Sequence, residues 1–124
     1  MIIDAKNKDY TVINDEINKT DKVFIEGCEG QRFIAAGTEG KKITIKNGIP
    51  GNALGAYLNG SEIDVYGNAQ DAVGDTMNDG SIIIRGSVGD AVGYAMRGGK
   101  IFVEKNAGYR AGIHIKEYKD KVPV

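Results

Sequence analysis

The chain has 124 residues, with 16 Lys and Arg against 17 Asp and Glu, a formal net charge of −1, one His, one Cys and no Trp. This length suits a single domain, and the near-neutral charge argues against electrostatic binding of nucleic acid or of an acidic membrane surface. One Cys excludes an internal disulfide framework, one His with one Cys cannot supply a His/Cys zinc site, and the lack of a long apolar run or secretory signal makes the cytoplasm the expected location.

Residue usage favours an all-β fold. The chain has 16 Ile and 9 Val but only 2 Leu, and β-branched side chains fit a pleated sheet better than a helix. All 18 glycines fall between Gly27 and Gly112, about twice the usual share of roughly 7%. Because Gly inside a regular element costs roughly 0.5–1 kcal/mol relative to Ala, the glycines are expected at turns or at close backbone approaches.

Residues 1–22 are expected to form an N-terminal capping segment. They contain no glycine, and Val12, Ile13, Glu16 and Ile17 are spaced like one face of a short amphipathic helix. A stack of β coils leaves open sheet edges at its ends, and open edges invite aggregation. We therefore expect this segment to cover the first coil as a strand or a helix.

Residues 23–118 carry a repeat. Gly55, Gly74, Gly93 and Gly112 follow one another at intervals of 19 residues, and Gly67 and Gly86 end two of the strands between them. An alternating pattern places two apolar side chains on one face before each interval: Ile43 and Ile45, Ile63 and Val65, Ile82 and Ile84, Ile101 and Val103. About four good copies follow a looser copy that begins at Val23. The six glycines are expected to be structural.

Units of this length cannot bury their own apolar face, so they must stack. Parallel pairing at about 4.8 Å per coil would bring matching positions into columns, with Ile63, Ile82 and Ile101 as stacked neighbours. Val73 with Val92, and Met77 with Met96, would line further walls. This predicts a β-solenoid of about five coils. The alternative is an antiparallel barrel, for which Asn-Gly supplies hairpin turns, but a barrel gives no reason for the period.

The chain closes with a charged C-terminal tail at residues 119–124, where Pro123 discourages further strand pairing. The predicted organisation is therefore a cap at 1–22, a glycine-repeat β-helix at 23–118 and this tail.

Candidate chemical groups have simple structural explanations. No glycine run matches a dinucleotide or P-loop motif, so repetition explains the glycines better than phosphate binding does. Carboxylates recur through the coils, and they are interpreted as turn caps that accept backbone N–H groups, with a small solenoid enzyme carrying paired acids as the alternative. These carboxylates are Asp64, Asp71, Asp75, Asp79 and Asp90.

The remaining reactive or aromatic side chains point to no catalytic site. His114 is interpreted as a surface residue, and Cys28 as a spectator because its acidic neighbours disfavour a thiolate. Tyrosines recur through the coils and suit either an interface patch or corner packing: Tyr57, Tyr66, Tyr94 and Tyr109. No catalytic, cofactor-binding or metal-ligating residue is assigned.

The glycine motifs resemble a known family. The runs Gly27 to Phe33, Gly51 to Leu58, Gly67 to Gly74 and Gly86 to Gly99 are similar to the glycine-repeat (GXGXG) domain that ends the large chain of glutamate synthase and is also found as a separate polypeptide. One of the subunits of formylmethanofuran dehydrogenase is a more distant relative. The resemblance covers about residues 23–118, and it implies a right-handed parallel β-helix.

The resemblance implies function by association. Glutamate synthase moves the amide nitrogen of glutamine to 2-oxoglutarate, using a glutaminase domain with an N-terminal Cys and a synthase domain with FMN and an iron–sulfur cluster. This chain has Met1 in place of that Cys and no cysteine cluster, so no catalytic or cofactor residue carries over and no cofactor is expected. The implied role is a non-catalytic scaffold with glutaminase and FMN-binding synthase chains as partners, and a homo-oligomer is compatible with it. The alternative roles are a formylmethanofuran dehydrogenase component and a solenoid enzyme.

Overall fold

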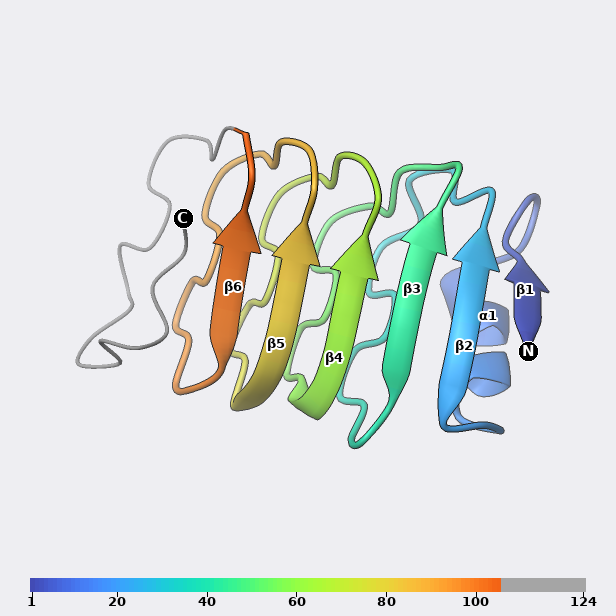
Figure 1. Ribbon diagram of the computed structural model, residues 1–124, viewed down its shortest axis with the longest axis horizontal. Helices are drawn as coiled ribbons and strands as arrows, with labels where there is room; N and C mark the ends of the chain where they lie inside the picture. Colours follow the sequence, from blue (N-terminus) through green and yellow to red (C-terminus); the bar gives the residue numbers. More distant parts are fainter. Residues whose placement is uncertain (106–124) are drawn as a thin grey trace.

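The computed structural model describes residues 1–105, which form a parallel β-solenoid with one short helix (Figure 1). Six strands make one sheet in chain order, and the helix follows the first of them. The elements are β1 (Ile2–Asp4), α1 (Tyr10–Ile17), β2 (Lys22–Glu26), β3 (Lys42–Lys46), β4 (Asn59–Val65), β5 (Asp79–Ile84) and β6 (Lys100–Val103). The predictions for Tyr109, Gly112, His114 and the tail at 119–124 lie outside the described residues.

Strand register confirms the predicted columns. Every strand pairs in parallel with the next, and Ile63, Ile82 and Ile101 are direct Cα partners along the sheet. Two inward columns run through the core: Val23, Ile43, Ile63, Ile82 and Ile101, and beside them Ile25, Ile45, Val65, Ile84 and Val103. All of these side chains are buried. Parallel pairing throughout rules out the antiparallel barrel.

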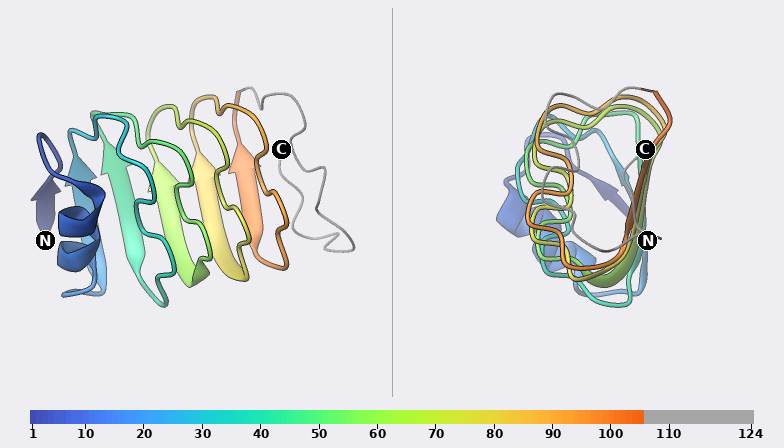
Figure 2. Two further views of the ribbon diagram at one scale, coloured as in Figure 1. Left: turned by 180° about the vertical axis from the view of Figure 1, so that it is seen from behind. Right: turned by 90° about the vertical axis from the view of Figure 1, so that its left-hand side faces the viewer.

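The coil is right-handed, as the resemblance implied. In Figure 1 the strands run upwards in front, the chain returns behind them, and each coil advances from β1 towards β6. Seen along the axis in Figure 2, successive coils superpose around one interior. The return segments at 32–38, 52–58, 71–77 and 90–96 form a second wall opposite the sheet, which we call the turn wall.

The turn wall has an unusual backbone. Positive φ angles alternate along each return segment, for example 58° at Ala72, 69° at Gly74 and 52° at Thr76. The alternation sends successive N–H groups to opposite neighbours, because Gly74 donates to Leu54 O of the preceding coil and Ala72 to Asp90 O of the following one, both at 2.8 Å. Hydrogen bonds to the coils on both sides therefore hold non-glycine residues in a left-handed conformation.

Apolar side chains of the turn wall close the core from the other side. The predicted pairs Val73 with Val92 and Met77 with Met96 are buried. Gly55 and Gly74 have their missing Cβ positions directed at the sheet, where Ile82 Cδ1 would lie 2.8 and 3.6 Å away. Isoleucines of the sheet thus fill the space that the glycines leave.

Helix α1 closes the N-terminal end, as expected for residues 1–22. Asp9 caps the helix by accepting from Thr11 N, and Ile13 and Ile17 are buried against the first coil. The Asn14 side chain donates to Phe33 O at 2.9 Å and accepts from Ala35 N at 2.8 Å. A single amide therefore takes the hydrogen bonds that a preceding coil would otherwise supply to the turn wall.

Within the described residues, α1 spans eight positions, and no helix there reaches the length and apolar character needed to cross a membrane.

Candidate interaction surfaces

The outer face of the sheet, called here the sheet face, carries three rows of side chains. Strand alternation turns every second residue outwards, and the parallel register lines these residues up across the coils. The row at the strand ends is Asp4, Glu26, Lys46, Tyr66, Arg85 and Glu104; the middle row is Ile2, Phe24, Thr44, Asp64, Ile83 and Phe102; the row at the strand starts is Lys22, Lys42, Glu62, Ser81 and Lys100.

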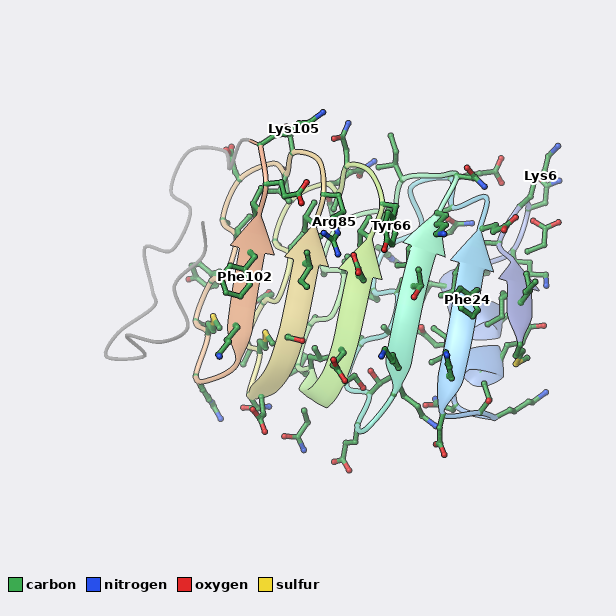
Figure 3. The ribbon with its side chains drawn as sticks, in the orientation of Figure 1. Lys6, Phe24, Tyr66, Arg85, Phe102 and Lys105 are labelled. Carbon is green, nitrogen blue, oxygen red and sulfur yellow. The ribbon has the colours of Figure 1, made fainter. Side chains whose placement is uncertain are left out.

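Arg85 organises the centre of the sheet face (Figure 3). Its Nε and Nη2 donate to the two carboxylate oxygens of Asp64 at 3.0 and 2.9 Å, and its Nη1 donates to Glu104 Oε1 at 3.3 Å. The Asp64 carboxylate raises the pKa of Arg85 above its usual value. The guanidinium also lies 5.2 Å from the ring centroid of Tyr66, and Lys46 Nζ lies 4.8 Å from that ring. These contacts fix an aromatic ring between two cations.

Apolar side chains are exposed at both ends of the middle row. Ile2 is 71% exposed, Phe24 37% and Phe102 43%. Figure 3 shows Phe24 and Phe102 projecting from the same face of the sheet, on either side of Tyr66 and Arg85. Exposed aromatic side chains arranged around fixed charged groups are typical of protein–protein interfaces.

The turn wall exposes a second group of aromatic side chains: Phe33, Tyr57 and Tyr94. Phe33 packs edge-to-face on Tyr10, with 5.5 Å between ring centroids, and Arg32 lies 5.4 Å from its ring. We call Phe33, Tyr57 and Tyr94 the turn-wall aromatics. They lie on three different coils, so this surface also spans the length of the solenoid.

A polar groove of about 490 Å³ follows the corner where the chain leaves β3, β4 and β5. Asn52 Oδ1 accepts from Asp71 N at 3.0 Å, Asn68 Oδ1 from Ser87 N at 2.8 Å, and Asp71 Oδ1 from Asp90 N at 2.8 Å. Each of these oxygens joins one coil to the next. The interpretation of the recurring carboxylates as turn caps is therefore confirmed at Asp71.

The other predicted carboxylates do not gather into one site. Asp64 pairs with Arg85 on the sheet face, Asp75 accepts from the Thr76 hydroxyl at 2.9 Å on the turn wall, and Asp79 begins β5. Among residues 1–105, no group of three or more His, Cys, Asp or Glu side chains is arranged to hold a metal ion.

Cys28 is buried, with 5% of its surface exposed, and burial raises the pKa of its thiol to about 11. The thiolate is the reactive form of cysteine, so a thiol with this pKa is poorly reactive near neutral pH. The structure thus supports the interpretation of Cys28 as a spectator.

We expect two measurable results from this burial. Iodoacetamide at pH 8 should modify Cys28 only after unfolding. Because the pKa is raised from an ordinary 9.0 in the folded chain, the folded state holds the thiol proton longer, and the free energy of unfolding should fall by about 2 kcal/mol as pH rises from 9 to 11. Urea unfolding of the chain and of Cys28→Ala across this range isolates the effect, since the variant should lack that part of the decline.

The comparisons with known proteins agree with the repeat and the fold. The family model described as the GXGXG motif matches residues 3–122. The chain belongs to the GXGXG motif family. An uncharacterized protein of Methanocaldococcus jannaschii is 54% identical over 132 aligned residues, which include all of this chain and 51% of the relative. This GXGXG domain therefore spans about half the length of that relative. No solved structure matches it.

Some surface features of this GXGXG domain could not be assigned from the sequence. The contacts of Arg85 with Asp64 and Tyr66 depend on the parallel register, which places side chains about 20 residues apart next to each other. Asn52 and Asn68 precede Asp71 and Asp90 by 19 and 22 residues, and only Asn52 shares their column. Of the tyrosines singled out in the sequence, Tyr66 lies on the sheet face, whereas Tyr57 and Tyr94 lie on the turn wall.

Proposed function

We propose that this GXGXG domain is a non-catalytic scaffold that docks the glutaminase and FMN-binding synthase chains of a glutamate synthase-type assembly, and so supports glutamine-dependent glutamate synthesis. The observation that carries the proposal is the family match over residues 3–122, joined to the resemblance of the same glycine motifs to the glutamate synthase domain.

The turn-wall aromatics support this role and suggest the docking surface. A solenoid whose coils are hydrogen-bonded on both walls presents its outer side chains at fixed spacing, which limits the entropy lost when a partner binds. Tyr and Phe are enriched at such interfaces because they supply a large contact area. Tyr57 is 59% exposed and Tyr94 45%, and both lie on the wall opposite the sheet.

The solenoid itself supplies safe substitutions for testing this surface. Tyr57 has a φ of 57°, and Ala95 adopts 54° at the matching position two coils later. Phe33 has a φ of 58°, and Ala53, Ala72 and Ala91 hold the matching positions at 58–61°. Tyr57→Ala and Phe33→Ala therefore introduce no conformation that the fold does not already contain.

The test is affinity capture of the tagged full chain from native extract, with the bound proteins identified by mass spectrometry. We expect glutaminase and flavoprotein synthase chains, and an at least tenfold lower yield with Tyr57→Ala and Phe33→Ala combined. Lys22→Ala, on the opposite face, is the matched control and should retain full yield. Recovery of molybdenum or tungsten proteins would instead favour the formylmethanofuran dehydrogenase role, and turnover by the isolated chain would contradict a scaffold.

A further inference from the structure

The sheet face is complementary to itself. It carries five cationic side chains (Lys22, Lys42, Lys46, Arg85 and Lys100) and five acidic ones (Asp4, Glu26, Glu62, Asp64 and Glu104), so its formal charge is zero. The whole chain carries a formal charge of −1, and two copies therefore meet with little long-range repulsion.

We propose that the sheet face binds the same face of a second copy of this chain, about a two-fold axis parallel to the strands that passes between β3 and β4. Stacked sheets lie about 10 Å apart and keep their strands within about 30° of each other. Under this symmetry β1 faces the partner's β6, β2 faces the partner's β5, and β3 faces the partner's β4. Each of the three rows then lies over its own copy in reverse order.

The middle row supplies the apolar contacts of this pairing. Ile2 comes opposite Phe102, and Phe24 opposite Ile83, and the symmetry makes each contact twice. Thr44 comes opposite Asp64, so that a hydroxyl donor meets a carboxylate acceptor. The exposed apolar side chains at the two ends of the row thus cover one another.

The outer rows supply charge complementarity. In the row at the strand starts, Lys42 comes opposite Glu62. In the row at the strand ends, Glu26 comes opposite Arg85, and Lys46 opposite the Tyr66 ring. One pair of like charges, Asp4 and Glu104, falls at the solvent-exposed rim, where a charge pair has the least effect.

The other two-fold arrangement of the same face lacks this complementarity. If the axis ran across the strands, each strand would face its own copy in the opposite direction. Lys42 would then lie opposite Lys46, and Asp64 opposite Asp64. Like charges at the centre of an interface oppose association, so the charge pattern selects the axis parallel to the strands.

The size of the face sets the expected strength. Six strands at about 4.8 Å and five residues at about 3.3 Å cover a plane area of about 500 Å², which is less than the roughly 800 Å² that each partner buries in a standard interface. We therefore expect a reversible dimer with a dissociation constant in the micromolar range, measurable by sedimentation equilibrium between about 1 and 500 µM.

The decisive experiment exchanges charges across the proposed axis. Lys42→Glu alone places two acidic groups opposite each other twice, and Glu62→Lys alone does the same with two cations, so each variant should dimerise at least tenfold more weakly than the original chain. An equimolar mixture of the two should form a heterodimer of near-original affinity, because each altered residue then meets its complement. The mixture also shows that both variants are folded.

Two controls separate this register from general charge attraction and from burial of any exposed ring. A mixture of Lys42→Glu with Ser81→Lys has the same net charges but no matched contact, and it should not recover affinity. Phe24→Ala should weaken the dimer at least tenfold, whereas Phe33→Ala, equally exposed at 38% but on the turn wall, should not. A chain that stays monomeric to 500 µM, or sheet-face variants that abolish capture of the glutaminase and synthase chains, would overturn the proposal. The capture experiment with Tyr57→Ala tests the docking function separately.

Discussion

Gly80→Ala is expected to lower the free energy of unfolding by about 3 kcal/mol or more. Gly80 has a φ of 106°, and a Cβ added there would lie 2.3 Å from Ser61 O and 3.0 Å from Ser61 N. Both atoms belong to the backbone of the preceding coil. Relief of the clash requires separation of β4 from β5 at their first residues, where Asn59 and Asp79 are partners. The substitution therefore combines a strained conformation with a broken coil contact.

Gly60→Ala is the matched control for this effect. Gly60 occupies the same column one coil earlier, with a φ of 115°, but its added Cβ would meet only Gly40 N, at 3.9 Å. The control should carry the conformational cost alone, about 1–2 kcal/mol. Urea unfolding followed by far-UV circular dichroism compares the two variants. Equal losses would show that the coils holding β4 and β5 do not approach as closely as the structure places them.

The column pair Gly60 and Gly80 also shows what the sequence could predict and what it could not. The period and the alternation of β-branched residues predict which side chains stack, because only stacking gives matching positions a common environment. The spacing nevertheless changes along the chain: Ile43 and Ile63 are 20 residues apart, and Ile63 and Ile82 are 19. The structure places the irregularity between Asn59 and Glu62, at a bulge that no local preference of these residues identifies.

The turn wall was the least predictable part of the fold. Glycine at a positive φ is expected, and Gly55, Gly74 and Gly93 have φ angles of 67–70°. Alanine has no such preference, yet Ala53, Ala72 and Ala91 adopt 58–61°. Their N–H groups donate to the following coil, as Ala53 does to Asp71 O at 2.9 Å. Contacts between coils therefore override the local preference, and a single repeat read alone carries no sign of it.

The surface contacts follow a similar division. Alternation within a strand predicts that Asp64 and Ile83 face outwards, once Ile63 and Ile82 are assigned to the core. The bidentate pairing of Asp64 with Arg85 is diagonal between coils and needs the register. The same register determines which charges on the sheet face meet under two-fold symmetry, so the proposed dimer could not be derived from the repeat alone.

Ile82→Ala is expected to lower the free energy of unfolding by about 3–4 kcal/mol, within the range for removing a buried isoleucine. Ile82 is fully buried at the centre of the inward column, and its Cδ1 reaches across the core to the missing Cβ of Gly55. Ile83→Ala is the control on the same strand, because Ile83 faces outwards and should lose less than about 1 kcal/mol. Both variants are unfolded in urea at a concentration where the chain is monomeric.

The opposing contact across the core gives this prediction a stricter form. Gly55→Ala would place a Cβ 2.8 Å from Ile82 Cδ1 and 3.2 Å from Ile63 Cδ1, although its φ of 67° is tolerated by an alanine elsewhere, since Ala35 holds the matching position at 63° and is fully buried. In an Ile82→Ala background the added methyl group enters the cavity instead of a filled space. The double variant should therefore be more stable than the sum of the single losses by about 1 kcal/mol or more. Additive losses would mean that the sheet and the turn wall do not touch at this point, and would contradict the shared interior on which the stacked fold depends.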